Sequence, residues 1–481
     1  MMEQFKQALF YTAIGKYSIV VVQLLVQAVL SRILTPAEYG IVAAVNIFLV
    51  FFQLLADFGI GPAVIQNKDL NKKELNDIFS FSLYIAFGLA IVFIFLGYPM
   101  SLFYGNDVFI PISMILAIAV FFYGILVVPQ SILLREKNFR LVNLTTVIGS
   151  VVSGVISIVL ALLNFSYYAI IIGNTARAAT LFLVFYMRTD IKIRFKFNWA
   201  PLKKIFAFSR NQFLFNFINY FSRNLDNLLI GRYFSSSALA YYDKAYQVSL
   251  YPNQVLTSLV TSVIHPILSD YEDEKERIKK VYLRISNLLA TLGMPLSIFL
   301  FFTAEEVILF LFGGQWEGSV QAFQILALSV WLQMILSSTG GIFQSANRTD
   351  LLLLSGILST VFNVAGIVIG ISMGKIEYVA GFLVLSFSLN FLQANYLLMI
   401  KMFKANLLEF LNVLKKPLYL ALMQAAVFWF LPELPLNIFF SLVVKGLIFV
   451  VVWIIGLFLT GEFKRLKLEI ERARGTAPDN N

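Results

Sequence analysis

The sequence predicts an all-α, polytopic membrane protein, and three observations lead to this fold class. The 481 residues are 59% hydrophobic and only 13% charged, which is too little charge for the surface of a soluble domain. Apolar runs long enough to cross a bilayer, about 20 residues each, recur along the whole chain. The sequence lacks the alternating segments of roughly 10 residues that a membrane β-barrel requires.

The apolar runs define fourteen candidate membrane spans. The first run is too long for a signal peptide and lacks a small-residue cleavage site, so we expect it to remain as a helix. The even number of spans predicts that both termini lie on one side of the membrane. The candidates cover roughly residues 11–31, 39–65, 78–103, 108–134, 141–163, 166–187, 205–231, 238–267, 281–302, 319–345, 350–373, 376–400, 417–431 and 436–460.

The basic residues sort by side once these spans are assigned. Of the 37 lysines and arginines, 27 fall in the terminal segments and loops of one side, 3 fall on the other side and 7 lie within spans. Cytoplasmic loops of membrane proteins carry the excess of positive charge. We therefore expect the termini in the cytoplasm. This sorting also accounts for the net charge of +10 without a nucleic-acid partner.

A weak internal repeat relates spans 1–6 to spans 7–12. The order of the matches along the chain carries the signal, and their offset drifts from 200 to about 214 residues. The matches are 30–45 with 229–245 (Arg32 with Arg232), Gly61-Pro62 with His265-Pro266, LFYG (102–105) with LFGG (311–314), Gln130 with Gln344, and Arg135 with Arg348.

The repeat predicts four regions. These are an N-terminal lobe (1–190), a C-terminal lobe (191–405), two extra helices (406–461) and a basic cytoplasmic tail (462–481). Because six spans are an even number, the two lobes have the same orientation. Transporters built from such repeats bind substrate between the halves and expose it alternately to each side.

Polar residues concentrate in spans 1, 2, 7 and 8, which are the first two helices of each predicted lobe. Their helical spacing predicts that they line a shared cavity. Lysine and arginine at a water-filled site suit a phosphate or a sugar acid. The candidate substrate-binding residues, which include one arginine of span 6, are Lys16, Gln23, Arg177, Asn216, Arg223, Asn227, Lys244, Gln247 and Gln254.

Three acidic residues accompany these cations within the spans. Asp57 precedes Gly59 and Gly61, so it is a candidate for stabilising a broken helix end, and Asp243 lies on the polar face of span 8. Asp226 is one turn from Arg223. That pair either faces the cavity or only joins the outer ends of two helices, and both interpretations stay open. In the extra helices, we expect Lys445 at a helix contact.

The sequence offers no chemistry for a metal or a covalent intermediate. Cysteine is absent and His265 is the single histidine, so no metal-ligand cluster and no thiolate nucleophile are expected. We expect no cofactor. The acidic cluster DYEDE (270–274) is interpreted as a solvated loop face, so a glycosyltransferase or polymerase activity is not supported and the protein is expected not to be an enzyme.

Two blocks of sequence resemble a known family. They are SRILTPAEYGIVAAVNIFLVFFQLLADFGIGPAVIQ (31–66) and SRNLDNLLIGRYFSSSALAYYDKAYQVSLYPNQVLTSLVTSVIHPILSD (222–270). They are similar to the first-half and second-half signatures of bacterial polysaccharide flippases. These are the Wzx-type exporters of the multidrug/oligosaccharidyl-lipid/polysaccharide (MOP) superfamily. Within it, the chain is most similar to colanic-acid and teichuronic-acid exporters.

The resemblance implies a specific activity. It implies a MATE-like V-shaped cavity between two six-helix lobes. It also implies flipping of an undecaprenyl-pyrophosphate-linked oligosaccharide from the inner to the outer leaflet of the bacterial cytoplasmic membrane, in lipopolysaccharide, O-antigen or exopolysaccharide synthesis. Ion-gradient coupling is implied as well, by H⁺ or Na⁺, with Asp57, Asp226 and Asp243 as candidates. The expected partners are the lipid-linked oligosaccharide and membrane lipids, with a polysaccharide polymerase or glycosyltransferases as candidate protein partners. A small-molecule or multidrug antiporter of the same superfamily is the alternative.

Overall fold

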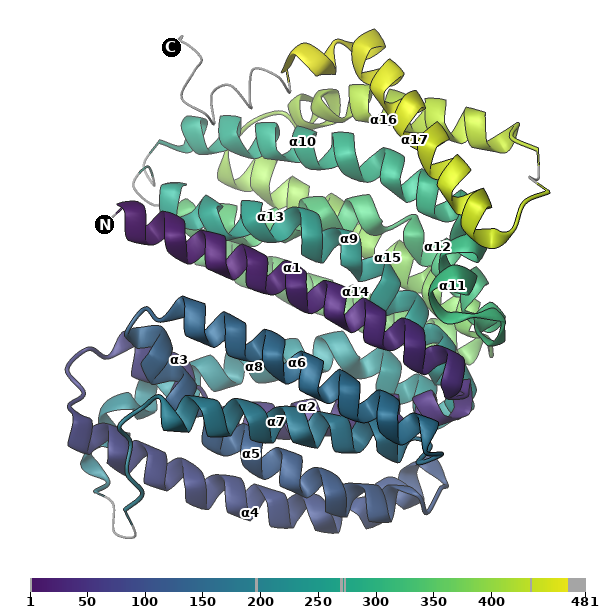
Figure 1. Ribbon diagram of the computed structural model, residues 1–481. Helices are drawn as coiled ribbons and strands as arrows, with labels where there is room; N and C mark the ends of the chain where they lie inside the picture. Colours follow the sequence, from purple (N-terminus) through teal and green to yellow (C-terminus); the bar gives the residue numbers. More distant parts are fainter. Residues whose placement is uncertain (1, 195–197, 269–270, 272–273, 433–434, 466–481) are drawn as a thin grey trace. The chain divides into compact units, whose positions relative to one another are not determined.

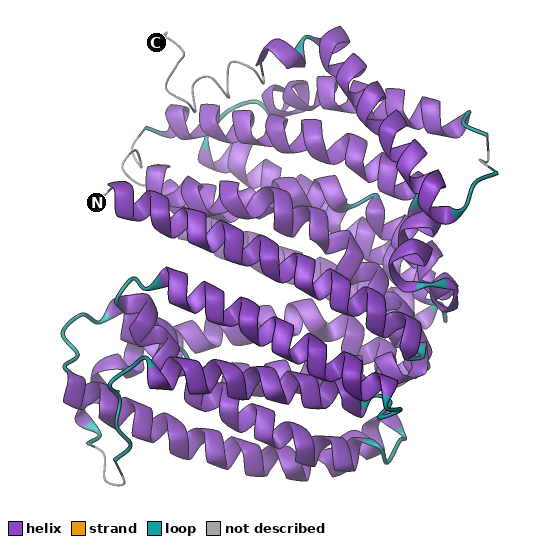
Figure 2. Ribbon diagram, in the orientation of Figure 1, coloured by secondary structure: helices purple, strands orange, loops and turns teal. Residues whose placement is uncertain are grey.

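The chain is built from helices joined by short loops (Figure 1). The computed structural model describes residues 2–194, 198–268, 271, 274–432 and 435–465. It does not describe the side chains of 2–11, 221–223, 258–267 and a few other positions between 207 and 219. Within the described ranges there is no β-strand (Figure 2). A helix satisfies its own backbone groups, as hydrocarbon requires.

The helices follow one another in this order: α1 (Met2–Ile33), α2 (Pro36–Asp57), α3 (Ile60–Gln66), α4 (Lys72–Tyr104), α5 (Phe109–Arg135), α6 (Phe139–Leu162), α7 (Tyr168–Met187), α8 (Ala200–Tyr233), α9 (Ser236–Leu268), α10 (Lys275–Phe302), α11 (Ala304–Phe312), η2 (Gly314–Ser319), α12 (Val320–Ala327), α13 (Val330–Ser345), α14 (Thr349–Ser372), α15 (Ile376–Tyr396), η3 (Leu397–Met402), α16 (Leu407–Trp429) and α17 (Ile438–Thr460).

Each predicted span lies mainly in helix, which confirms the all-α prediction for the described residues, although α16 begins ten residues before the predicted span over 417–431. Among them, ten helices are long and apolar enough to cross a membrane, or eleven if one bent pair counts as a single span. The chain is therefore a multi-pass membrane protein. The other predicted spans are α8, α9 and α16, which carry more polar residues. The count of fourteen stays a prediction.

The region after α10 differs from the single predicted span over 319–345. The short helix α11 comes first, and the spanning segment is split into Gly314–Ala327 and Val330–Ser345, bent by 55°. At the bend, the Ser329 hydroxyl donates to the Leu326 carbonyl at 2.7 Å. A hydroxyl that bonds back into the preceding turn competes with the backbone ladder and bends a helix.

The chain forms two compact units, residues 1–241 and 242–481. In the first unit, α4 packs on α5, α1 on α6, and α8 on α2, α3 and α4. In the second unit, α10 packs on α13 and α16, α14 on α15, and α17 on α11 and α16. The first unit includes α8, whereas the lobe predicted from the repeat ends at residue 190. The lobe boundaries remain a prediction.

The backbone repeats itself at corresponding turns. Between α1 and α2, the Leu34 N–H donates a hydrogen bond to the Leu30 carbonyl, and the Thr35 hydroxyl accepts one from the N–H of Glu38. Between α8 and α9, Phe234 and Ser235 make the same two bonds, 200 residues later. The match of Arg32 with Arg232 therefore has a structural counterpart.

The later part of the repeat has a different register from the one predicted. In the α5–α6 turn, Lys137 has a positive φ of 62°, and in the α13–α14 turn, Asn347 has a φ of 53°. The surrounding backbone hydrogen bonds are the same at an offset of 210 residues. Arg348 thus corresponds to Asn138, and Gln344 to Leu134. The predicted matches of Arg348 with Arg135 and of Gln344 with Gln130 are wrong, because such short motifs cannot resolve a shift of one helical turn.

An ion pair attaches α17 to α11 in the second unit. The Lys445 ammonium pairs with the Glu306 carboxylate, and both side chains are mostly buried. The Ser441 hydroxyl donates to the same carboxylate oxygen at 3.1 Å. The prediction that Lys445 lies at a helix contact is confirmed. A lysine and a glutamate in an apolar helix pair are tolerated because each neutralises the other.

Removing one member of this pair should destabilise the protein more than removing both. In Lys445→Met the Glu306 charge stays buried without its partner, so we expect a clear fall of the unfolding temperature in detergent, equivalent to about 1–2 kcal/mol. The double variant Lys445→Met/Glu306→Gln should recover much of that loss. Equal unfolding temperatures for wild type and Lys445→Met would contradict the assignment.

Candidate functional site

The α2–α3 break brings a candidate acid to a helix end. Phe58 and Gly59 have positive φ values of 42° and 72°, which ends α2 and redirects the chain into α3. The Asp57 carboxylate accepts a hydrogen bond from the Gly61 N–H at 3.1 Å. The carboxylate therefore satisfies a backbone donor at the start of α3, so its expected role at a broken helix end is confirmed.

Helix α8 closes this break from one side. The Ser209 hydroxyl donates to the Gly59 carbonyl at 3.2 Å, and a Cβ on Gly59 would lie 2.4 Å from the Ser209 carbonyl oxygen. The rings of Phe58 and Phe213 stack at 4.8 Å, and the Tyr220 hydroxyl donates to a carbonyl of α2. Gly59 is thus required by its φ and by the closeness of α8.

The polar stripe of α8 is described only in part. The side chain of Arg223 lies outside the described residues, so the open question of its pairing with Asp226 stays open. Asp226 is buried and accepts from the Asn227 N–H at 2.8 Å. Asn227 is half-buried, and Asn216 accepts from the Gln212 amide at 3.2 Å.

Helix α9 presents its predicted site residues in different surroundings. Lys244 is only 3% exposed, and its ammonium lies 5.1 Å from the centre of the Phe312 ring and 5.7 Å from that of Trp316. Such rings stabilise a desolvated cation. The side-chain amide of Gln247, one helical turn after Asp243, donates a hydrogen bond to the Asp243 carboxylate at 2.6 Å. Gln254 is exposed.

The candidates on α1 and α7 differ in exposure. Lys16 is exposed and Gln23 is half-buried on α1. Arg177 lies midway along α7 and is half-buried, with its Nε atom enclosed by protein. The candidate set therefore holds a surface lysine, a buried lysine against rings and a half-buried arginine. Their roles toward a substrate remain predictions.

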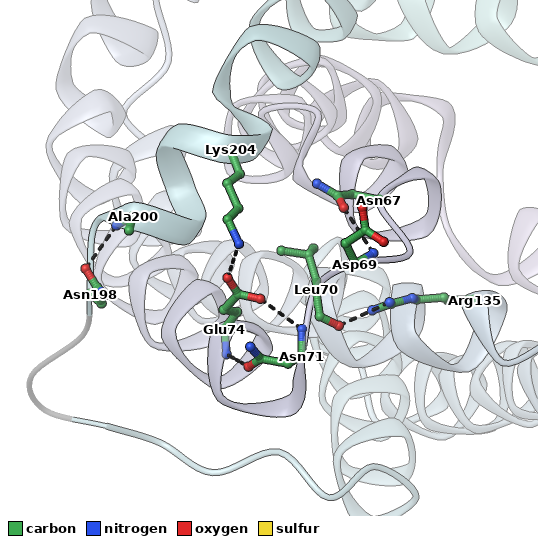
Figure 3. Close-up of polar contacts among 9 residues, drawn as sticks. All are labelled: Asn67, Asp69, Leu70, Asn71, Glu74, Arg135, Asn198, Ala200 and Lys204. Carbon is green, nitrogen blue, oxygen red and sulfur yellow. Dashed lines mark hydrogen bonds and ion pairs between the residues drawn. The ribbon is translucent and has the colours of Figure 1, made fainter.

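The sequence did not predict a polar network at one end of the first unit (Figure 3). Lys204 of α8 pairs with Glu74, whose carboxylate also caps α4 by accepting from the Asn71 N–H. The Arg135 guanidinium donates to the Leu70 carbonyl at 3.1 Å and to the Lys68 carbonyl. The spacing of Asn71 and Glu74 is a capping-box signal that could have located its centre.

The loop after α7 is bound to α4 near the same network. The N–H groups of Lys192 and Arg194 donate to the side chains of Asn76 and Ser80, at 2.9 and 2.8 Å. Lys72 and Asp190 form an exposed ion pair at 2.8 Å, and this hydrogen bond lowers the pKa of the Asp190 carboxyl below its ordinary value. These contacts fix helix ends and hold no reactive group.

The candidate residues can form ion pairs and hydrogen bonds. Among the described residues, no group of three or more histidine or acidic side chains could hold a metal ion. The candidate acids Asp57, Asp226 and Asp243 each accept a hydrogen bond from within the same unit. The cations are suited to anionic oxygen atoms of a ligand.

The comparisons with known proteins identify the family. A family model described as "Polysaccharide biosynthesis protein" matches residues 29–321, more than half of the chain. The chain belongs to this family. The match spans both sequence blocks on which the resemblance was based, so the resemblance to polysaccharide exporters is confirmed.

Individual relatives extend the match beyond this region. The teichuronic acid biosynthesis protein TuaB of Bacillus subtilis is 25% identical over 345 residues, 71% of each chain. The lipopolysaccharide biosynthesis protein WzxC of Escherichia coli is 22% identical over 449 residues, 91% of this chain and 87% of the relative. The succinoglycan biosynthesis transport protein ExoT of Rhizobium meliloti is 26% identical over 307 residues, 63% of this chain and 61% of the relative.

Solved structures show the same fold. The lipid II flippase MurJ in an inward closed conformation matches 94% of this chain and 99% of its own, with a TM-score of 0.77 and 14% identity. An inward-facing multidrug resistance MATE family transporter of the MOP superfamily matches 83% of this chain and 98% of its own, with a TM-score of 0.63 and 17% identity. The polysaccharide biosynthesis family member described here therefore has the MOP fold.

The Asp57 contact predicts that two substitutions of this residue differ in their effect on stability. In Asp57→Ala, the Gly61 N–H loses its acceptor, so the free energy of unfolding should fall by about 1 kcal/mol. In Asp57→Asn, the amide oxygen can still accept that bond, and stability should stay near wild type. Thermal unfolding of the purified proteins in detergent measures both. An Asp57→Ala protein as stable as wild type would show that the contact does not hold α3 in place.

Proposed function

We propose that this protein flips an undecaprenyl-pyrophosphate-linked oligosaccharide from the inner to the outer leaflet of a bacterial cytoplasmic membrane. The observation that carries this proposal is the combination of family and fold: a polysaccharide biosynthesis family member has, over 94% of its length, the fold of a lipid II flippase. Translocation occurs by alternating access and makes or breaks no covalent bond.

The charges within the helices support an anionic cargo. A diphosphate carries negative charge through a region where an unbalanced charge costs about 2.5–3.5 kcal/mol on insertion scales. Cations along the path reduce this cost. Lys16, Arg177 and Arg223 are the candidates for such contacts, and Lys244 is the weakest of the predicted four because two rings already cover its ammonium.

The finer topology belongs to the same proposal. Fourteen spans, with α8, α9 and α16 crossing as polar helices, place both termini in the cytoplasm. Ion-gradient coupling by H⁺ or Na⁺ is assigned to Asp57, Asp226 or Asp243. A polysaccharide polymerase or glycosyltransferases would act on the lipid-linked oligosaccharide after or before this step.

The fold likeness to a MATE transporter favours one alternative, a multidrug antiporter. An antiporter for cationic drugs would be expected to depend on acids within the membrane. Here the candidate substrate-binding residues within the helices include the cations Lys16, Arg177 and Arg223, which suit an anionic cargo. We therefore prefer the flippase.

The transported species can be measured with the purified protein in liposomes. A fluorescent undecaprenyl-diphosphate oligosaccharide is placed in both leaflets, and a membrane-impermeant reductant bleaches the outer leaflet. We expect the protein to bring the inner-leaflet pool to the outside, where it is bleached. Protein-free liposomes and a fluorescent phosphatidylcholine are the controls. Efflux of a cationic dye without any movement of the lipid diphosphate would favour the antiporter instead.

The orientation can be tested because the natural chain has no cysteine. The exposed residues Lys192 and Glu317 are replaced singly by cysteine. In intact cells, a membrane-impermeant maleimide should label Glu317→Cys and leave Lys192→Cys unlabelled until the inner membrane is opened. The reverse labelling would invert the proposed topology.

A further inference from the structure

Arg177 lies at mid-depth in a membrane-spanning helix of the first unit. It is the tenth residue of α7, which spans Tyr168–Met187. At about 1.5 Å per residue, it is roughly 15 Å from either helix end. An arginine side chain cannot extend that far to reach the interface by snorkelling. The charge must therefore be balanced near the middle of the membrane.

Two glycines, which have no side chain, allow α7 to pack closely on α6 beside Arg177. The stem of Arg177 approaches α6 at Gly149, where a Cβ would lie 3.5 Å from the Arg177 Cγ. One turn away, a Cβ on Gly173 would lie 2.0 Å from the Ser157 hydroxyl, so α6 and α7 are in close contact. Since Gly173 and Leu181 flank Arg177 on the same helical face and both are buried, Arg177 faces the protein and not only lipid.

The guanidinium of Arg177 has no protein counter-ion among the described residues. Its Nε is enclosed and makes no hydrogen bond, and no ion pair or hydrogen bond joins the side chain to any described group. The hydroxyl of Tyr123, a residue of α5, lies within electrostatic range of Arg177, but it carries no negative charge at neutral pH. By contrast, Lys445 forms an ion pair with Glu306, and the ammonium of Lys244 lies over the rings of Phe312 and Trp316.

We propose that Arg177 forms an anion-binding subsite with α5 and α6 that takes a pair of anionic oxygens of the transported substrate. This inference rests on the proposed flippase function. The residue is half-buried: its stem packs next to Gly149 and its Nε is enclosed, whereas the two terminal nitrogens of the guanidinium are not among the enclosed atoms without a partner. A fixed planar fork of N–H donors matches the oxygens of a phosphate or a sugar carboxylate.

The test uses the full-length protein in liposomes and two undecaprenyl-diphosphate oligosaccharides, one with neutral sugars and one with a uronic acid. We measure the lipid concentration at half-maximal flipping for Arg177→Gln, Arg177→Lys and Arg188→Gln. The last is a matched control, because Arg188 is an exposed arginine directly after α7. Arg177→Gln should raise this concentration about tenfold or more, and Arg177→Lys by a smaller factor, because the charge remains but the fork is lost. Arg188→Gln should behave as wild type.

The two substrates identify the anion. An equal effect on both assigns the subsite to the diphosphate, and an effect confined to the acidic oligosaccharide assigns it to the sugar carboxylate. Thermal unfolding in detergent shows whether each variant is folded. If Arg177→Gln is unfolded, the half-maximal lipid concentration of Arg177→Lys tests the subsite instead. An unchanged half-maximal concentration for the folded Arg177 variants would overturn the subsite. If the wild type moves neither lipid, the proposed function itself fails.

Discussion

The rest of the structure depends on one constraint: hydrocarbon offers neither hydrogen-bond partners nor screening to a polar group. It explains why the described chain is helical almost throughout. It also sorts the charged side chains by how each is compensated. Lys445 pairs with the carboxylate of Glu306, and the ammonium of Lys244 lies over aromatic rings. The Asp57 carboxylate accepts a hydrogen bond from a backbone N–H at the start of α3. In this setting, a cation that lacks protein compensation indicates a place for water or a ligand.

The same constraint limits where the backbone can break. The α2–α3 break frees N–H and C=O groups inside a membrane protein, and they are satisfied by Asp57 on one side and by Ser209 of α8 on the other. Irregular backbone at membrane depth is tolerated only where protein or water covers it. The break therefore requires α8 to lie close, which the absence of a Cβ on Gly59 permits. The position of α8 and the shape of α2 depend on each other.

Hydropathy was enough to predict the fold class and the approximate position of the ten most apolar helices, because a bilayer requires about 20 apolar residues in a row. It could not predict the bend at Ser329, which depends on one hydroxyl, or the register of the later repeat. Nor could it predict that Lys244 lies on Phe312 and Trp316, because tertiary packing decides that contact. Asp57 was predictable as a helix-end group because the glycines that break the helix are its sequence neighbours.

The fold alone does not determine the cargo, since proteins with the MOP fold include a lipid II flippase and a multidrug transporter. The difference must come from side chains along the path. The ammonium of an exposed lysine such as Lys16 is a point charge on a flexible stem, so it offers an anion little geometric preference. An arginine whose stem is held by a neighbouring helix has lost that freedom before the ligand arrives, and it presents donors in fixed directions. Discrimination among anionic head groups is therefore expected from the fixed cation, and attraction into the path from the mobile one.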